Sequence, residues 1–160
     1  MFFKKKVVVA DYCYGKLQML KLPETVAFWG GLKDLSDDPV FRDTSSERVA
    51  EQLFAAHIQL LSMSINKQYR DINLHAAVHG CVQSFIAQHF QPSMETLVRM
   101  YNSAFGSSPT DGVLAMVHLL DMTVADGRLN DKTRAMLYDV MYAFVSARFA
   151  DFKGIKLVVS

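Results

Sequence analysis

Four oxygen-bearing side chains fall close together near the C-terminus, with the chemistry of a divalent-cation site. They are Asp121, Asp126, Asn130 and Asp131. Calcium, for example, needs several carboxylate or carbonyl oxygens at about 2.3–2.6 Å. The spacing does not fit the EF-hand loop, because Thr133 stands where that loop needs a bidentate glutamate. The alternative interpretation is that these side chains cap helices and bind no ion.

Histidines form a second candidate metal site. His75 and His79 are four positions apart and share one face of a helix, as in helices that bind zinc. His118 and Asp121, from another helix, would complete the ligand set. The metalloprotease glutamate is absent, because two alanines and a valine separate the first two histidines. The alternative is that these are surface or hydrogen-bonded core histidines.

Other catalytic patterns are lacking. Cys81 lies between Val78 and Val82, which indicates a core position instead of the polar cleft that a nucleophile needs. The sequence has no glycine-rich phosphate loop, no catalytic carboxylate pair and no nucleotide fingerprint. We therefore expect a protein that is not an enzyme. A metal-dependent helical enzyme or a metal-binding protein is the alternative.

The acidic residues lie between two segments whose apolar side chains recur at helical spacing. Gly127 is predicted to end the first helix as a left-handed C-cap, and Asn130 or Asp131 to cap the second. Leu129 is predicted to point back between the two helices. The apolar positions are Val113, Met116, Val117, Leu120 and Val124 in the first helix, and Met136, Leu137, Val140, Met141 and Phe144 in the second.

Five more helices precede this hairpin. Thr44 is predicted to cap the third of them, because Glu47 follows at capping-box spacing. Gly30-Gly31 indicates a kink or the close approach of another backbone. Ser108 is predicted to cap the sixth helix, which starts at Pro109. The five helices are predicted at about residues 6–20, 23–35, 45–66, 74–90 and 94–105.

These elements predict an all-α fold, a compact bundle of about seven helices in a single domain over residues 1–160. Residues 1–10 are expected to be a mobile basic and aromatic N-terminus, although the valines at 7–9 would suit an extended start of the first helix. Residues 155–160 are expected to dock as an extended tail.

Composition limits the partners and the compartment. The net charge is +1, which gives no field for nucleic acid. Cys13 and Cys81 are too few for a disulfide framework, so we expect buried free thiols in a reducing, cytoplasmic setting. No apolar run reaches the roughly 20 residues of a membrane span. Residues 2–6, with two phenylalanines and three lysines, leave peripheral membrane contact as an alternative.

Residues 125–131, Ala-Asp-Gly-Arg-Leu-Asn-Asp, resemble the TerB-like family. That family includes tellurite-resistance protein TerB and the N-terminal part of DjlA-type co-chaperones. Its pattern is an apolar helix, Ala-Asp-Gly, an apolar residue two positions later, and acidic residues before a second helix. Residues 124–133 fit it, and residues 32–45 resemble the family's connection between two helical halves. The first half lacks its own Asp-Gly turn, and Thr133 replaces a frequent glutamate.

The resemblance implies two pseudo-repeated helical halves and a non-catalytic binding or scaffold module in bacterial stress response, tellurite resistance or phage defence. It implies a protein partner, and it gives Asp126 and Asp131 a role in binding a divalent cation such as calcium, magnesium or zinc. An interaction or immunity-type protein unrelated to TerB is the alternative. A homodimer is a further alternative.

Overall fold

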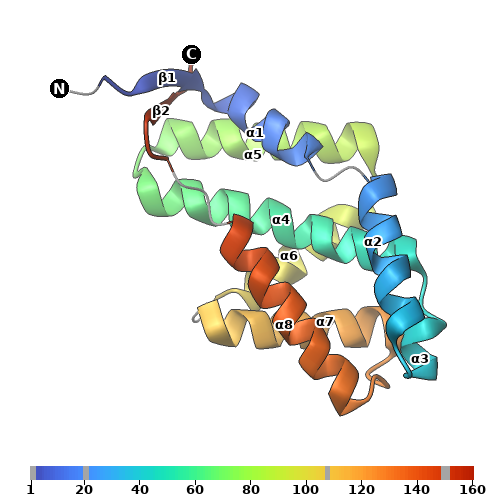
Figure 1. The fold of residues 1–160 in the computed structure, drawn as a ribbon. Helices are drawn as coiled ribbons and strands as arrows, with labels where there is room; N and C mark the ends of the chain where they lie inside the picture. Colours follow the sequence, from blue (N-terminus) through green and yellow to red (C-terminus); the bar gives the residue numbers. More distant parts are fainter. Residues whose placement is uncertain (1–2, 20–21, 107–108, 149–151) are drawn as a thin grey trace.

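The structure is mainly helical, so the expected all-α class is confirmed (Figure 1). This computed structural model describes residues 3–19, 22–106, 109–148 and 152–160. Its elements in chain order are β1 (Lys5–Val8), α1 (Val9–Gln18), α2 (Leu22–Leu35), α3 (Pro39–Arg42), α4 (Ser46–Gln68), α5 (Ile72–His89), α6 (Ser93–Ala104), α7 (Pro109–Ala125), α8 (Asp131–Arg148) and β2 (Ile155–Val158).

The described helices number eight, one more than predicted, because α3 was missed. This single turn begins at Asp38, whose Oδ1 accepts hydrogen bonds from the backbone N–H groups of Val40 (3.0 Å) and Phe41 (3.4 Å). Pro39 occupies the first helical position, where no N–H donor is needed. An aspartate followed by proline is a recognisable helix start, but four residues are too few to show a helical period.

The two ends of the chain form a short parallel pair of strands, with Val7 opposite Leu157 and Val8 opposite Val158. The predicted helix start at residue 6 was wrong, because the β-branched valines take the extended conformation that suits them. The alternative of an extended start is therefore confirmed. The tail also docks as extended chain, and Leu157 is only 1% exposed.

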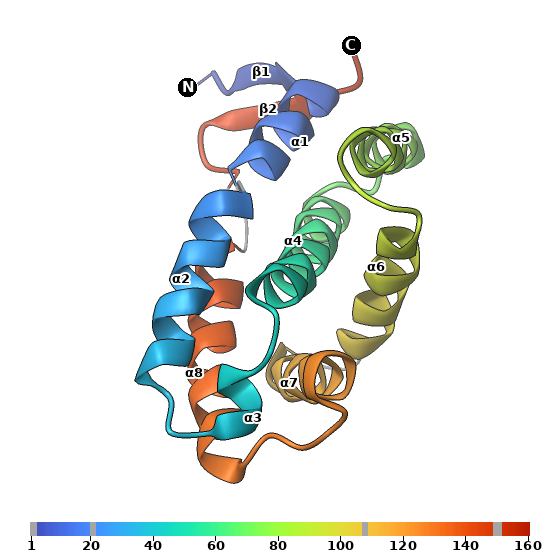
Figure 2. The same cartoon turned by 90° about the vertical axis from the view of Figure 1, so that its right-hand side faces the viewer.

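Helix α4 is the centre of the molecule, and its apolar residues on several sides suit that position. It packs against α1, α2, α5, α6, α7 and α8, which surround it in Figure 2. Buried side chains occur on every turn from Val49 to Ile65.

The N-cap of α4 lies one residue later than predicted. Ser45 Oγ accepts a hydrogen bond from the N–H of Arg48 at 3.3 Å. The predicted cap, Thr44, instead donates its hydroxyl to the carbonyl oxygen of Phe41 at 2.7 Å. Thr44 therefore caps the C-terminal end of α3, and its predicted role as the N-cap of α4 was wrong.

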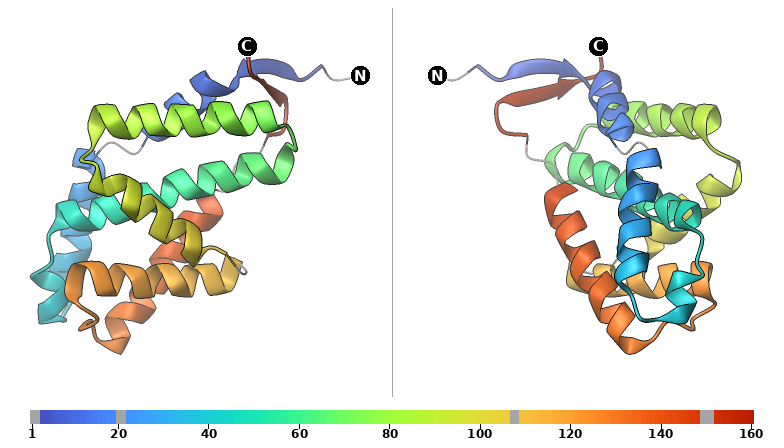
Figure 3. Two further views of the ribbon diagram at one scale, coloured as in Figure 1. Left: turned by 180° about the vertical axis from the view of Figure 1, so that it is seen from behind. Right: turned by 45° about the vertical axis from the view of Figure 1, so that its right-hand side comes forward.

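Helix α5 lies between α1 on one side and α4 and α6 on the other (Figures 2 and 3). Asp71 caps it by accepting a hydrogen bond from the N–H of Asn73 at 2.9 Å. Val78, Val82 and Ile86 are buried. Both long faces of α5 are thus adjacent to other helices.

The glycine pair in α2 does not mark a close backbone approach. A Cβ atom added at Gly30 or Gly31 would meet no atom within 4 Å. That part of the prediction was wrong, and α2 runs from Leu22 to Leu35 through the pair. Beside it, Trp29 is fully buried whereas Phe28 is half-exposed.

The α7–α8 hairpin buries most of its predicted apolar positions. Val124, Met136, Val140 and Phe144 are half-buried. The predicted cap Ser108 lies outside the described residues. The fully buried positions are Val113, Met116, Val117, Leu120, Leu137 and Met141.

Candidate functional site

The turn between α7 and α8 reverses the chain through two residues with left-handed backbone conformation. Asp126 has φ 53° and Gly127 has φ 73°. The N–H of Gly127 donates to the carbonyl oxygen of Asp121 at 3.2 Å, so the predicted role of Gly127 in ending the helix is confirmed. Leu129, 2% exposed, points into the core as predicted.

A guanidinium group lies between two of the predicted cation ligands. Asp121 is buried, and its Oδ1 accepts a hydrogen bond from the N–H of Leu129 at 3.1 Å. Arg134 contacts Oδ2 of Asp121 at 3.2 Å and Oδ1 of Asp131 at 2.7 Å. Its hydrogen bond to Asp131, together with both negative charges, raises the pKa of Arg134. The positive charge in this turn therefore comes from the protein itself.

The other two predicted ligands point elsewhere. Asn130 Oδ1 accepts a hydrogen bond from the N–H of Thr133 at 2.8 Å, which makes it the N-cap of α8. Asp126 is exposed, with its Oδ2 3.9 Å from a guanidinium nitrogen of Arg128. Within the described residues, no three His, Cys, Asp or Glu side chains converge so that they could hold a metal ion. The geometry therefore favours the capping interpretation over a cation site.

Asp38, which the sequence analysis did not select, joins this turn to the start of α3. Its Oδ2 accepts a hydrogen bond from the N–H of Asn130 at 2.9 Å, across 92 positions of sequence. Burial alone would raise the pKa of Asp38. The hydrogen bonds from Asn130, Thr133, Phe41 and Val40 outweigh burial, so the pKa lies below its ordinary value. The carboxylate is thus held in its charged form.

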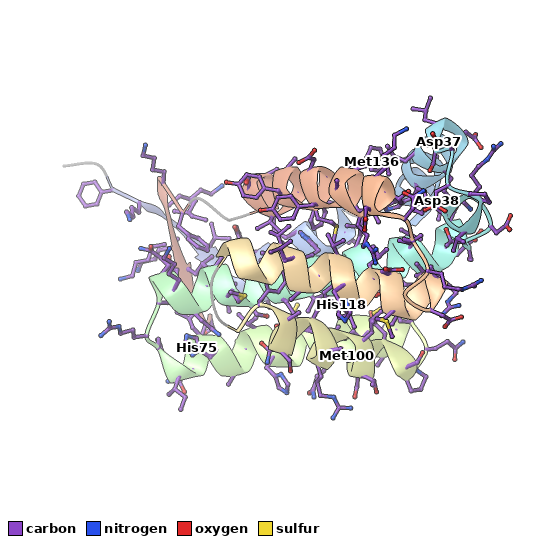
Figure 4. All side chains as sticks on the ribbon, turned by 90° about the horizontal axis from the view of Figure 1, so that it is seen from below. Asp37, Asp38, His75, Met100, His118 and Met136 are labelled. Atoms are coloured by element: carbon purple, nitrogen blue, oxygen red, sulfur yellow. The ribbon has the colours of Figure 1, made fainter. Side chains whose placement is uncertain are left out.

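A surface ion pair runs beside this buried link. Asp37 Oδ2 lies 2.9 Å from Nζ of Lys132, and both side chains are exposed. The hydrogen bond from Lys132 lowers the pKa of Asp37. Figure 4 shows Asp37 and Asp38 together at the end of the molecule where α8 begins. The acidic turn is therefore docked on the α2–α3 connection.

The three histidines of the alternative metal site are not brought together. His75 and His79 lie on α5, where Nε2 of His75 is 2.7 Å from the carbonyl oxygen of Tyr69. His118 is exposed on α7, and α6 separates the two helices (Figures 2 and 4). The arrangement favours ordinary surface and hydrogen-bonded histidines.

The first two histidines do line a groove of about 440 Å³ between α4, α5 and α6. These three helices are seen together in the left view of Figure 3. Five buried aliphatic side chains line it: Ile58, Val78, Val82, Ile86 and Val98. The polar side chains that line it are Gln59, Ser62, Asn66, His75, His79, Gln83, Glu95, Arg99 and Asn102.

A second groove, of about 410 Å³, lies where α4 meets α6 and α7, and Arg48, Leu97 and Met100 line it. Two residues that line it, Gln52 and Thr123, belong to a polar network in which Tyr101 donates its hydroxyl to Oε1 of Gln52 at 2.8 Å. Thr123 Oγ1 donates to the same oxygen at 3.2 Å. Burial raises the pKa of Tyr101. This network has the buried, hydrogen-bonded character of a core element.

The N-terminal segment is only partly described. Phe3 is 90% exposed, and Lys5 and Lys6 are exposed in β1. Residue 2, part of the predicted membrane contact, lies outside the described residues. Among the described helices, none combines the length and apolar character that crossing a bilayer requires.

Comparisons with protein-family models, with curated proteins and with solved structures found no match to this chain.

Proposed function

We propose that this protein is a non-catalytic binding module of TerB-like type, and that the groove between α4, α5 and α6 takes a peptide segment of a partner protein. The observation that carries the proposal is the lining of this groove, with buried aliphatic side chains beneath polar, mostly uncharged ones. A volume of about 440 Å³ lies in the range of ligand pockets, roughly 300–1,000 Å³.

The aliphatic lining supports a partner that inserts apolar side chains. Val78, Val82 and Ile86 follow one another at i, i+4 and i+8 along α5, so they form a single stripe. Val98 of α6 and Ile58 of α4 lie on the other sides of the groove. A partner side chain that enters the groove would bury its own apolar surface against this stripe, with a gain of about 25 cal/mol for each Å² of that surface.

The amide side chains support a polypeptide as the ligand. Gln59, Asn66, Gln83 and Asn102 each offer both a donor and an acceptor. A peptide backbone offers the same pair at every residue other than proline. Four such side chains around an aliphatic stripe thus match a main chain with apolar side chains better than they match a charged metabolite.

The acidic turn has a structural role in this proposal. Arg134 supplies the positive charge between Asp121 and Asp131, and Asn130 caps α8. The proposal therefore includes no cation. The TerB-like assignment, and with it a role in stress response or phage defence, rests on residues 124–133 and remains part of the proposal.

A displayed library of random peptides tests the proposal without knowledge of the natural partner. We expect selected peptides to carry aliphatic residues, and we expect the amide NMR signals that shift on binding to belong to the residues lining the groove. The selection of no peptide from a diverse library would contradict the proposal. So would binders whose shifts cluster at the α7–α8 turn.

A further inference from the structure

The two cysteines of the chain are neighbours in the fold, although they lie on helices far apart in sequence. Cys13 belongs to α1 and Cys81 to α5. The Sγ atom of Cys81 is 3.6 Å from the carbonyl oxygen of Ala10, one helical turn before Cys13. The two thiols are also close enough for each to influence the pKa of the other. The packing of α1 along α5 holds them together (Figure 2).

The two thiols differ in their access to solvent. Cys13 is fully buried. Cys81 is half-buried and lines a groove of about 320 Å³ between the two helices, together with Asp11, Ala77 and Ser84. A small reagent in this groove therefore reaches Cys81, whereas Cys13 is covered. This is the arrangement of a reacting cysteine with a resolving partner behind it.

We propose that Cys13 and Cys81 are a redox modification site, at which a low-molecular-weight disulfide such as oxidised glutathione converts the two thiols into an intrachain disulfide. The thiolate of Cys81 attacks one sulfur of the reagent, forms a mixed disulfide and releases one glutathione thiolate. The thiolate of Cys13 then attacks Sγ of Cys81 and releases the second. Two protein thiols are oxidised, one glutathione disulfide is reduced to two thiols, and the proton of each cysteine passes to a released thiolate.

The chemical environment makes oxidation of the pair slow. Burial, with a smaller contribution from the neighbouring Cys81, raises the pKa of Cys13 to about 12. Burial also raises the pKa of Cys81. Both groups are therefore neutral thiols at physiological pH, so oxidation is slow and needs an excess of the disulfide reagent. This inference is independent of the proposed peptide groove.

Oxidised glutathione added to the folded, reduced chain is the test. We expect the intact mass to fall by two hydrogens and a single cross-linked peptide to contain both cysteines. The melting temperature should rise on the order of 5–10 °C, because the bond closes a long loop. Thiols that both stay free, a reaction that stops at the mixed disulfide, or a fall in melting temperature would each overturn the proposal.

Two single variants check the order of events. In Cys13→Ala, Cys81 should accumulate the glutathione adduct, because no second thiol resolves it. In Cys81→Ala, Cys13 should remain unmodified until denaturant is added. Equal modification of the two variants in the folded state would contradict the assignment of Cys81 as the reacting thiol.

Discussion

Asp38 is a buried residue that joins the α2–α3 connection to the α7–α8 turn, and each of its two carboxylate oxygens accepts hydrogen bonds from a different one of these segments. Oδ1 caps α3, whereas Oδ2 accepts the N–H of Asn130. We predict that Asp38→Asn lowers the free energy of unfolding by about 1–3 kcal/mol at neutral pH. Asparagine has one oxygen and one NH₂ group, so it cannot accept at both positions. Urea unfolding measures the difference.

The difference in the free energy of unfolding between wild type and Asp38→Asn should depend on pH. Because the pKa of Asp38 in the folded protein lies below its ordinary value of 3.8, its stabilisation is complete above that value. This stabilisation is lost as the pH falls through the pKa of Asp38 in the folded protein. The difference in unfolding free energy between wild type and Asp38→Asn should therefore become smaller in acid. Asp37→Asn is the control, and removing its solvent-exposed ion pair with Lys132 should change the free energy of unfolding far less than Asp38→Asn does. Equal losses in the two variants would contradict the buried link.

Arg134 leads to a prediction about ions. We expect calcium, magnesium and zinc to leave the melting temperature of the wild type unchanged, because a guanidinium already lies between Asp121 and Asp131. Removing the guanidinium in Arg134→Ala takes one partner from the buried Asp121 carboxylate, so the melting temperature should fall. A saturable rise in wild-type melting temperature with calcium, abolished in Asp131→Ala, would restore the cation site.

Local sequence rules predicted the roles of those residues in the α7–α8 turn whose contacts lie close by in the sequence. Asn130 caps the helix that begins one residue later, and Leu129 is the one apolar residue in a polar turn. Asp38 was missed because its partner lies 92 positions away. No spacing rule joins positions so far apart; only the packed fold does so.

Two glycines in different elements should respond in opposite ways to alanine. Gly127 has φ 73°, and an added Cβ would lie 2.9 Å from Sδ of Met122. We predict that Gly127→Ala destabilises the protein by about 1–2 kcal/mol. Gly31 lies inside α2 with open space at its Cβ position. Gly31→Ala should therefore stabilise it by about 0.5–1 kcal/mol. Thermal and urea unfolding of the pair measure both effects, and effects of the same sign would contradict this description.

The sequence predicted long elements better than short ones. Helices α4, α5 and α6 were located to within about two residues, because each spans several turns of apolar periodicity. The four-residue α3 has no such signal. The β1–β2 pair was also missed, although the extended character of each end was noted, because parallel pairing joins the two ends of the chain.

The arrangement of helices around α4 creates the features on which both proposals depend. Helix α5 has one face on the α4–α5–α6 groove and the other on α1 and Cys13. Neither groove was predictable, because each depends on how helices from separate parts of the sequence pack. The sequence showed that Val78 and Val82 are core-like, but not that polar amides would surround them.

The central claim is that the groove between α4, α5 and α6 binds a peptide. It is tested most directly by comparing peptide affinity in two matched variants of α5. Gln83 and Gln88 are both exposed glutamines, but Gln83 lines this groove and Gln88 lines the one beside α1. We predict that Gln83→Arg weakens binding of a selected peptide at least about tenfold, or 1.4 kcal/mol, while Gln88→Arg leaves it unchanged. Equal affinities, or equal losses, would contradict the claim.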